Sequence, residues 1–393
     1  MMTQAQFDPA TAVARRHIGL LSTYPPQLCG LATFAAALEL GLKQGGSDVD
    51  VVRIDDDYEA TWNGRPVTGN LIKGVPASLR HAAAVLSQCD VAVVQHEYGI
   101  YGGDDGEEIL DVLEALDVPS IVTLHTVPLR ATERQRAILT AIAEHASRLV
   151  VMTKCALDRL LRLYPVDASR VVVIPHGALV PTIDLSDRPV RYGDPVPELL
   201  TWGLLGPGKG IEHTLDALAL LNDFPRRPRY TVAGVTHPKV LARDGNAYRH
   251  FLIERARHLG IDDLVTFDDT YRDVERLTHF VESASVVVLP YNSRDQVTSG
   301  VLVDAIAAGR PVIATEFPHA VEMLSSGAGI LVHHADPAAL ADAIKLAFTD
   351  TTALASMAAE ARRLAPSLSW TTVAGQYATL ADELLGSRQA IAM

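Results

Sequence analysis

The segment GLLGPGKG, residues 203 to 210, has the composition of a loop that could hold a phosphate group. It follows an apolar run at 199–203 and precedes a helical pattern, so it would join a strand to a helix. It differs in one residue from the phosphate-binding pattern GxxxxGK[ST], because Gly210 stands where Ser or Thr would ligate Mg²⁺. We therefore expect Gly203, Lys209 and Gly210 to contact a diphosphate without a metal ion. A surface turn with a solvated lysine is the alternative.

A second candidate segment is YNSRDQVTSGVLVDAIAAGRPVIAT, residues 291–315, whose polar and small positions include Gln296, Thr298, Ser299, Gly300 and Asp304. Either hydroxyl residue could cap a helix, and the glycine would leave the amides at the helix start uncovered. The carboxylate of Asp304 could accept two vicinal hydroxyls, such as those of a ribose. A capped core helix with one acid at its rim is the alternative, and the neighbouring phosphate loop favours ligand binding.

Candidates in the first half of the chain share a position just after an apolar run: Gly30, His96, Glu97, Tyr98 and His125. Gly30 opens a helical pattern, where a phosphate could approach backbone amides, although a plain tight turn fits equally well. The three consecutive polar side chains suit a polyhydroxyl ligand, and a loop anchored by its own hydrogen bonds is the alternative. His125 could be either structural or functional.

The elements that would position these residues alternate along the chain. Apolar runs, each followed by a helical pattern, occur at 17–22, 49–54, 91–95, 121–124, 149–152 and 171–175 and resume at 199–203, 230–234, 264–267, 285–290, 311–315 and 329–332. Continuous apolar strands with helical crossovers predict parallel sheets covered on both faces. A proline-rich stretch at 175–198 separates the two series. The α/β pattern predicts two Rossmann-like doubly wound domains facing a central crevice, an N-terminal domain at 1–180 and a C-terminal domain at 181–370.

Composition limits the possible partners. The net charge of −13 argues against nucleic acid, and no apolar run is long enough for a signal peptide or a transmembrane segment. A basic surplus between 130 and 170 favours a solvated helix face over peripheral membrane contact. The odd, widely spaced cysteines Cys29, Cys89 and Cys155 imply neither a disulfide framework nor a zinc site, so a cytoplasmic location is expected.

The ordered motifs resemble the family 4 glycosyltransferases of the GT-B fold. The likeness covers essentially the whole chain and is strongest from Trp202 to Val332, with VIPHG at 173–177 and LSW at 368–370 as further matching segments. It implies that the last helix, 371–393, crosses back to the first domain. Two departures stand out: Leu204 replaces the Arg that the family pairs with its loop lysine, and Gln296 and Asp304 occupy the positions of its Glu-x7-Glu pair.

This resemblance implies a retaining, metal-independent enzyme that uses a nucleotide-diphospho-sugar and no cofactor. Lys209 would bind the donor diphosphate, Gln296 would lie near the transferred sugar and Asp304 would hold the ribose. Gly30 would allow the first-domain loop to approach the phosphates, and His125 would touch the sugar near the reacting centre. His125, Lys209 and Gln296 are thus the expected catalytic residues.

The segments YPPQLCGLATF (24–34), QHEYGIYGG (95–103) and TSGVL (298–302) resemble a mannosyltransferase-like branch of the family. This resemblance implies a hexose donor, with GDP-mannose favoured over UDP-glucose, and a carbohydrate or small hydroxyl acceptor. A nicotinamide-dependent dehydrogenase is disfavoured because GLATFA, residues 30–35, lacks the GxGxxG pattern. A GT-B-fold epimerase or phosphorylase and a non-catalytic nucleotide-sugar-binding protein are the open alternatives. The donor base, the sugar and the acceptor are not determined by these motifs.

Overall fold

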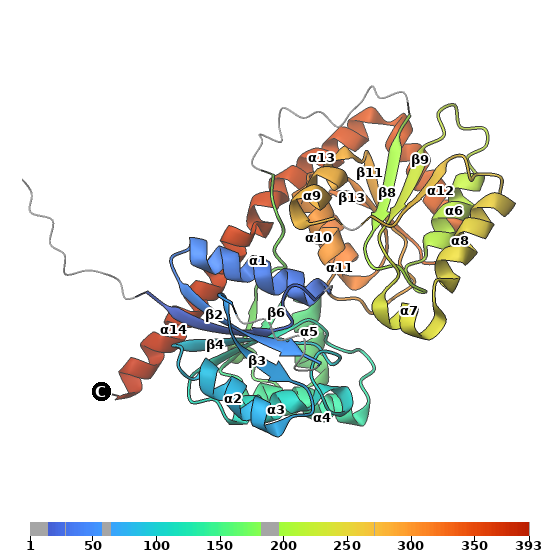
Figure 1. Ribbon diagram of the computed structural model, residues 1–393. Coiled ribbons are helices and arrows are strands. Elements are labelled where there is room, and N and C mark those ends of the chain that lie inside the picture. Colours follow the sequence, from blue (N-terminus) through green and yellow to red (C-terminus); the bar gives the residue numbers. More distant parts are fainter. Residues whose placement is uncertain (1–14, 28, 57–63, 182–195, 271, 393) are drawn as a thin grey trace, which may run out of the picture. The chain divides into compact units, whose positions relative to one another are not determined.

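The computed structural model describes residues 15–27, 29–56, 64–181, 196–270 and 272–392 (Figure 1). In this described part, two parallel sheets carry the strands, and helices alternate with them along the chain. The predicted α/β class with two doubly wound sheets is confirmed. Prolines and polar residues at 182–195, the middle of the predicted linker, lie outside the described residues.

The first sheet has the strand order β3-β2-β1-β4-β5-β6-β7. Its strands are β1 (His17–Ser22), β2 (Asp48–Asp55), β3 (Val67–Ile72), β4 (Val91–His96), β5 (Ser120–Leu124), β6 (Arg148–Val151) and β7 (Val171–Val173). The intervening helices are α1 (Gly30–Gln44), α2 (Pro76–Leu86), α3 (Glu108–Glu114), α4 (Glu133–His145) and α5 (Lys154–Leu163). The order reverses between β1 and β4, which makes their carboxyl ends the switch point of this sheet.

The second sheet has the strand order β10-β9-β8-β11-β12-β13, and each neighbouring pair is parallel. Its strands are β8 (Glu198–Trp202), β9 (Arg229–Ala233), β10 (Val265–Asp268), β11 (Val286–Leu289), β12 (Val312–Thr315) and β13 (Gly329–Val332). Its helices are α6 (Ile211–Ala219), α7 (Pro238–Asp244), α8 (Ala247–His258), α9 (Val274–Ser283), α10 (Gly300–Ala307), α11 (Pro318–Leu324), α12 (Pro337–Thr349) and α13 (Thr351–Leu364). The last helix, α14 (Trp370–Ala392), belongs for most of its length to the compact unit that contains the first sheet. Its switch point lies between β8 and β11.

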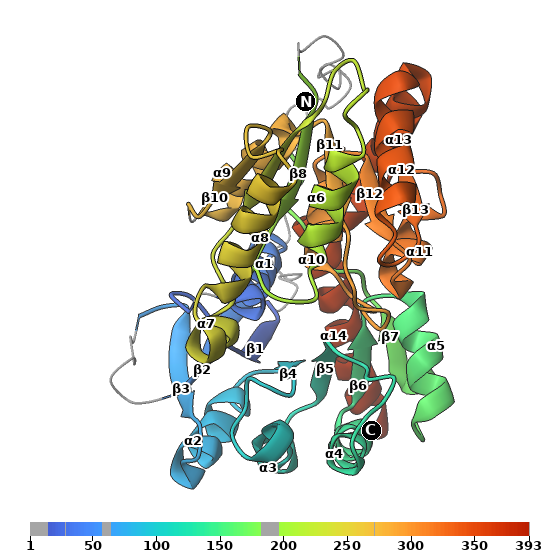
Figure 2. The same ribbon diagram turned by 90° about the vertical axis from the view of Figure 1, so that its right-hand side faces the viewer.

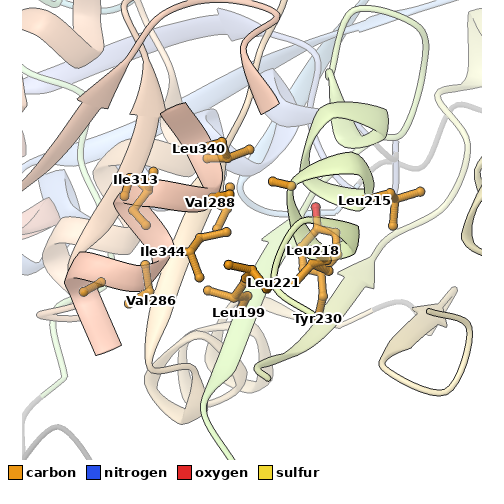
Figure 3. Close-up of a cluster of buried hydrophobic side chains, with 14 of the residues drawn as sticks. Leu199, Leu215, Leu218, Leu221, Tyr230, Val286, Val288, Ile313, Leu340 and Ile344 are labelled. Carbon is orange, nitrogen blue, oxygen red and sulfur yellow. The ribbon is translucent and has the colours of Figure 1, made fainter. Parts of the chain in front are cut away.

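Both faces of the second sheet are buried, which explains why its strands read as continuous apolar runs. In β11, Val286 and Val288 join one hydrophobic cluster, with side chains from α6, α8 and α12 (Figure 3). Val287 and Leu289 join another, with side chains from α9, α10 and α11. Figure 1 shows α6 and α8 to the right of β8, and in Figure 2, which is viewed from that side, both helices lie in front of the strand.

The sequence analysis missed β3, an edge strand of the first sheet that pairs only with β2 among the described strands. Its sequence VTGNLI alternates exposed and buried positions at its start and carries Gly and Asn, so it lacks the apolar run by which the other strands were identified. The other predicted strands agree with the structure to within about two residues at each end, the usual uncertainty of strand boundaries.

Contacts divide the chain into two compact units. The first comprises 1–123, 141–149 and 374–393, and the second comprises 124–140 and 150–373. Within the first unit, the Tyr377 hydroxyl of α14 lies 2.9 Å from Thr123 Oγ1. The domain boundary predicted at 180 and 181 stays a prediction. None of the described helices combines the length and the apolar character that a membrane crossing requires.

Candidate functional site

Two loops at the switch point of the second sheet are packed against each other. One is the 203–210 loop, which joins β8 to α6, and the other follows β11. The Asn292 amide donates to the Gly208 carbonyl at 2.9 Å. Gly210 has a φ of +66°, and a Cβ there would lie 1.8 Å from the Pro290 carbonyl oxygen. Only glycine fits this position, which is the physical reason that Ser or Thr, the Mg²⁺ ligand of phosphate loops, is absent from it.

Lys209 extends across the second of these loops. Its Nζ lies 4.5 Å from the centroid of the Tyr291 ring. That ring is buried and stacks on Phe317 at a centroid distance of 5.2 Å, so it is a rigid platform. No carboxylate of the described residues forms an ion pair with the lysine. A cation–π contact orients the ammonium group without neutralising it, so its charge remains available to an anion.

A polar network fixes the start of α6 beside this loop. His213 Nε2 lies 2.9 Å from Asn292 Oδ1, and Asn292 Nδ2 donates to Glu212 Oε1 at 3.2 Å. The Tyr248 hydroxyl donates to the other Glu212 oxygen at 2.6 Å. The sequence analysis did not select these residues, because isolated polar side chains near a helix start carry no signal of which partner they meet.

The start of α10 presents backbone amides at the same switch point. Ser299 is the N-cap, and its hydroxyl accepts from the Leu302 amide at 3.3 Å. The Ser299 amide itself donates to Nδ1 of His319 at 2.8 Å. It is therefore already satisfied, and the amides left at the helix start are those of Gly300 and Val301. A Cβ on Gly203 would lie 3.6 Å from the Val301 side chain, which places the phosphate-type loop next to these amides.

A buried histidine, His319, and a partly buried one, His176, support the α10 start. His319 Nδ1 accepts a hydrogen bond from the Ser299 amide, so this ring nitrogen carries no proton. Burial lowers the pKa of the His319 imidazole to about 3. His176 Nδ1 lies 2.7 Å from the Gly177 carbonyl, and burial lowers its pKa to about 4. Its Nε2 would lie 2.9 Å from a Cβ at Gly300. Position 300 must therefore be glycine, because a larger residue would collide with the His176 ring. Sequence reasoning noted VIPHG as a motif but did not select either histidine.

Gln296 and Asp304 occupy different environments. Gln296 Nε2 donates to the Thr298 carbonyl at 3.1 Å, so this side chain braces its own loop. Asp304 lies one helical turn inside α10 and is partly buried, and this burial raises its pKa to about 7. It has no hydrogen-bond partner among the described residues, and neither does the buried Thr298 hydroxyl. Both groups are able to bond the hydroxyls of a ligand.

The candidates of the first unit lie at the switch point of the first sheet. His96 ends β4 and is fully buried, its two ring nitrogens have no partner among the described residues, and burial lowers its pKa to about 3. It packs edge-on against the buried Tyr98 at 4.9 Å, and Glu97 accepts from the Tyr98 amide at 3.2 Å. Gly30 begins α1, with no atom within 4 Å of a Cβ placed on it.

The structure therefore brings Gly203, Lys209, Gly210, Gln296, Thr298, Ser299, Gly300 and Asp304 to one switch point in the second unit. Gly30, His96, Glu97 and Tyr98 belong to the first unit. His125 follows β5, belongs to the second unit and is partly buried. These arrangements offer one unpaired cation, a pair of helix-start amides and an uncompensated carboxyl group. That combination suits a ligand with both phosphates and hydroxyls.

Both halves of the chain match families of glycosyltransferases. Residues 29–178 match the family described as Glycosyltransferase Family 4, and residues 196–350 match Glycosyl transferases group 1. A D-inositol 3-phosphate glycosyltransferase of Frankia alni is 31% identical over 258 residues, which cover 61% of this chain and 62% of that protein. One from Paenarthrobacter aurescens is 26% identical over 390 residues, covering 87% and 90%. The chain spans about three-fifths of the length of the first curated relatives it matches.

Solved structures share the fold at low sequence identity. A glycosyltransferase from Rickettsia africae superposes with a TM-score of 0.73 at 15% identity, covering 95% of this chain and 99% of the other. A sucrose-phosphate synthase from Thermosynechococcus elongatus gives 0.72 at 20%, covering 95% and 100%. Anabaena HepE, solved in complex with UDP-glucose, gives 0.69 at 16%, covering 94% and 100%.

Proposed function

We propose that this protein, which carries a glycosyltransferase family 4 segment followed by a glycosyl transferases group 1 segment, is a retaining, metal-independent hexosyltransferase that uses a nucleotide-diphospho-sugar. The observation that carries the proposal is the placement of Lys209 and the α10 amides at one switch point of the second sheet, beside the uncompensated carboxyl group of Asp304. A diphosphate and a ribose together match these three groups in charge and hydrogen-bonding capacity.

The chemistry follows from where negative charge develops. When the sugar leaves, the nucleoside diphosphate gains charge on its terminal phosphate. Lys209 and the amides of Gly300 and Val301 would then stabilise the transition state more than the ground state. The lysine is the main cation here because Leu204 stands where the related pattern has Arg. No Mg²⁺ ligand is needed for this role.

The remaining site residues would position the donor. Asp304, as a carboxylate, would accept hydrogen bonds from the ribose hydroxyls. Gln296 is neutral, so it would bond sugar hydroxyls or keep its loop in place, and His125 would contact the transferred sugar. No described side chain is placed as a covalent nucleophile in this proposal. The acceptor hydroxyl would attack from the face that the diphosphate leaves, and its proton would pass to the departing phosphate oxygen.

The donor and acceptor are proposed at the level of class. A hexose is expected, and GDP-mannose was favoured over UDP-glucose by the resemblance. The complex of Anabaena HepE with UDP-glucose makes a UDP-sugar the second candidate donor. The relatives named D-inositol 3-phosphate glycosyltransferase favour a small phosphorylated polyol as acceptor within the expected class of hydroxyl compounds. A cytoplasmic location stays a prediction, and peripheral membrane contact through 130–170 stays the less favoured alternative to a solvated helix face.

The proposal can be tested by a thermal-shift screen against nucleotide-diphospho-sugars, followed by turnover of each binding donor with a panel of polyol and sugar acceptors. A ligand at about 100 times its Kd should stabilise the fold by roughly 2.7 kcal/mol. Acceptor-dependent release of nucleoside diphosphate is expected. Release without an acceptor would indicate an epimerase, a phosphate requirement would indicate a phosphorylase, and binding without any turnover would indicate a binding protein.

A further inference from the structure

Three side chains with metal-ligand chemistry meet in the first unit, at the amino ends of its strands. His17 begins β1, Asp50 lies near the start of β2, and Cys89 precedes β4 by two residues. His17 Nε2 lies 3.0 Å from Asp50 Oδ2 and 3.6 Å from Cys89 Sγ. One ligand atom from each residue falls within 4.8 Å of the others, and among the described residues no other group of three potential ligands does so.

The two separations that involve the imidazole nitrogen are close to those around a tetrahedral ion. Zinc binds imidazole nitrogen at about 2.0 Å, carboxylate oxygen at about 2.1 Å and thiolate sulfur at about 2.3 Å, which sets neighbouring ligand atoms roughly 3.3–3.6 Å apart. The nitrogen–sulfur distance of 3.6 Å already matches. The nitrogen–oxygen distance of 3.0 Å is that of a hydrogen bond, and replacing the bond by two metal bonds requires a movement of only a few tenths of an ångström.

The backbone holds the three groups in place. A Cβ on Gly19 would lie 3.1 Å from Cys89 Sγ, so the missing side chain provides the space that the thiol occupies on this face of the sheet. The Asp90 amide donates to the His17 carbonyl at 2.8 Å, and the His17 amide donates to Asp90 Oδ2 at 2.8 Å. These two bonds fix the segment that carries the cysteine against β1, so the ligand atoms are positioned before any ion arrives.

The site is also accessible and negatively charged. The side chains of His17 and Asp50 are 36% and 21% exposed, while Cys89 is buried, so solvent can reach one side of the group. The carboxylates of Asp50 and Asp90 lie next to the His17 side chain and the His17 amide respectively, and their charge attracts a cation. To bind the ion as a thiolate, Cys89 must release its proton, which passes to solvent.

We propose that His17, Asp50 and Cys89 bind one zinc-like divalent cation, with water as its fourth ligand. Mixed nitrogen, oxygen and sulfur ligands suit Zn²⁺ and Co²⁺ and disfavour Mg²⁺ and Ca²⁺. The imidazole would bind through Nε2 and keep its proton on Nδ1. The ion would tie β1, β2 and the segment before β4 together. Cys89 lies seven residues before His96, or roughly 23 Å along an extended chain, so the ion would be far from that end of β4 and would have a structural role.

The test uses the full-length, untagged chain, stripped with chelator and kept reduced without thiols. Titration with Co²⁺ should produce the thiolate-to-cobalt charge-transfer absorption at one equivalent, and Zn²⁺ should displace it. In Cys89→Ser this absorption should disappear and Zn²⁺ affinity should fall at least about tenfold. Cys155→Ser removes a partly buried cysteine of the second unit and should retain both properties.

Asp50→Asn serves as the second variant in case Cys89→Ser does not fold. It should keep the thiolate absorption and lose affinity by roughly tenfold, because one charged ligand is replaced by a weaker neutral one. Circular dichroism without metal confirms that each variant is folded. Zn²⁺ affinity in the parent no higher than in folded Cys89→Ser, or an absorption that persists in Cys89→Ser, overturns the proposal.

Discussion

Lys209 places its ammonium nitrogen 4.5 Å above the ring centroid of Tyr291, and no carboxylate in the described part of the chain pairs with it. The aromatic ring orients the cation but leaves its charge uncompensated. A lysine side chain that is already oriented loses little conformational entropy when an anion binds. This relationship makes Lys209 the most informative residue for the proposed function.

Lys209→Ala should lower kcat/KM with the true donor by roughly 30- to 1000-fold, or about 2–4 kcal/mol of transition-state stabilisation. Leu204 cannot replace the missing charge. Steady-state kinetics measures the loss. Lys345→Ala is the matched control, because Lys345 is a half-exposed lysine of α12 whose partner is Asp342 at 3.6 Å, and it should retain parent activity. Near-normal turnover of Lys209→Ala would mean that the 203–210 loop is only a turn.

Asp304 and Gln296 should respond differently to removal. Asp304→Ala should weaken binding of the nucleoside diphosphate by roughly 1–3 kcal/mol, since two ribose hydroxyls lose a charged acceptor. Gln296→Ala should bind the diphosphate almost as the parent does but turn over the intact donor more slowly. Calorimetry with diphosphate and with donor on both variants measures this. Equal losses of diphosphate affinity at the two sites, or none at Asp304, would contradict the proposed placement of the ribose.

Asp304 should also make stability depend on pH. Burial raises its pKa from 3.8 to about 7 in the folded protein, so between these values the folded state holds a proton that the unfolded state has released. Raising the pH through this window should therefore lower the free energy of unfolding, by on the order of 1–3 kcal/mol after allowance for partial exposure. In Asp304→Asn this loss should be absent.

The measurement is urea unfolding of parent and Asp304→Asn at several pH values from about 5 to about 8. The comparison between the two proteins matters, because His96 and His319 have lowered pKa values and contribute the opposite slope, losing stability as the pH falls. A difference between parent and variant that does not change with pH would show that the Asp304 carboxyl is ionised throughout.

Turnover should survive removal of metal ions at the donor site. Gly210 provides no metal ligand, and Lys209 with the α10 amides supplies the positive charge. Initial rates after brief chelator treatment should equal those of untreated enzyme. A loss of rate could also come from the cation proposed at Cys89, so the treatment is repeated on Cys89→Ser. Chelator-sensitive turnover in that variant, restored by Mg²⁺ or Mn²⁺, would contradict metal-independent transfer.

Gly210→Ala should disturb the loop through sterics alone. Its Cβ would lie 1.8 Å from the Pro290 carbonyl oxygen, and its φ of +66° disfavours any side chain. We expect a loss of at least about 2 kcal/mol in unfolding free energy, together with a loss of donor affinity. Gly375→Ala is the control, because that glycine lies in α14 with open space around it, and the change should be neutral or stabilising. Equal thermal stability of the two variants would argue against the close contact.

The sequence by itself was sufficient to predict two parallel α/β sheets and all but one of their described strands. Strands buried on both faces must be apolar at every position, so β11 and its neighbours are visible as runs such as SVVVLP. The Lys209 loop was also identified from a local pattern, because glycines and a lysine between a strand and a helix are typical of a phosphate-binding loop. The edge strand β3 was not predicted, because a partly exposed strand does not need a continuous apolar run.

The tertiary structure decided everything that depends on contacts between distant residues. The sequence analysis explained Gly300 as leaving the helix start uncovered. In the structure the His176 ring, more than 100 residues earlier in the chain, occupies the space that a side chain at position 300 would need. The raised pKa of Asp304 comes from burial that no local pattern reports. The cysteine spacing implied no zinc site, yet parallel pairing of β1 with β2 and β4 brings His17, Asp50 and Cys89 together. Sequence periodicity reports which face of an element is buried, and only the fold decides which side chains meet there.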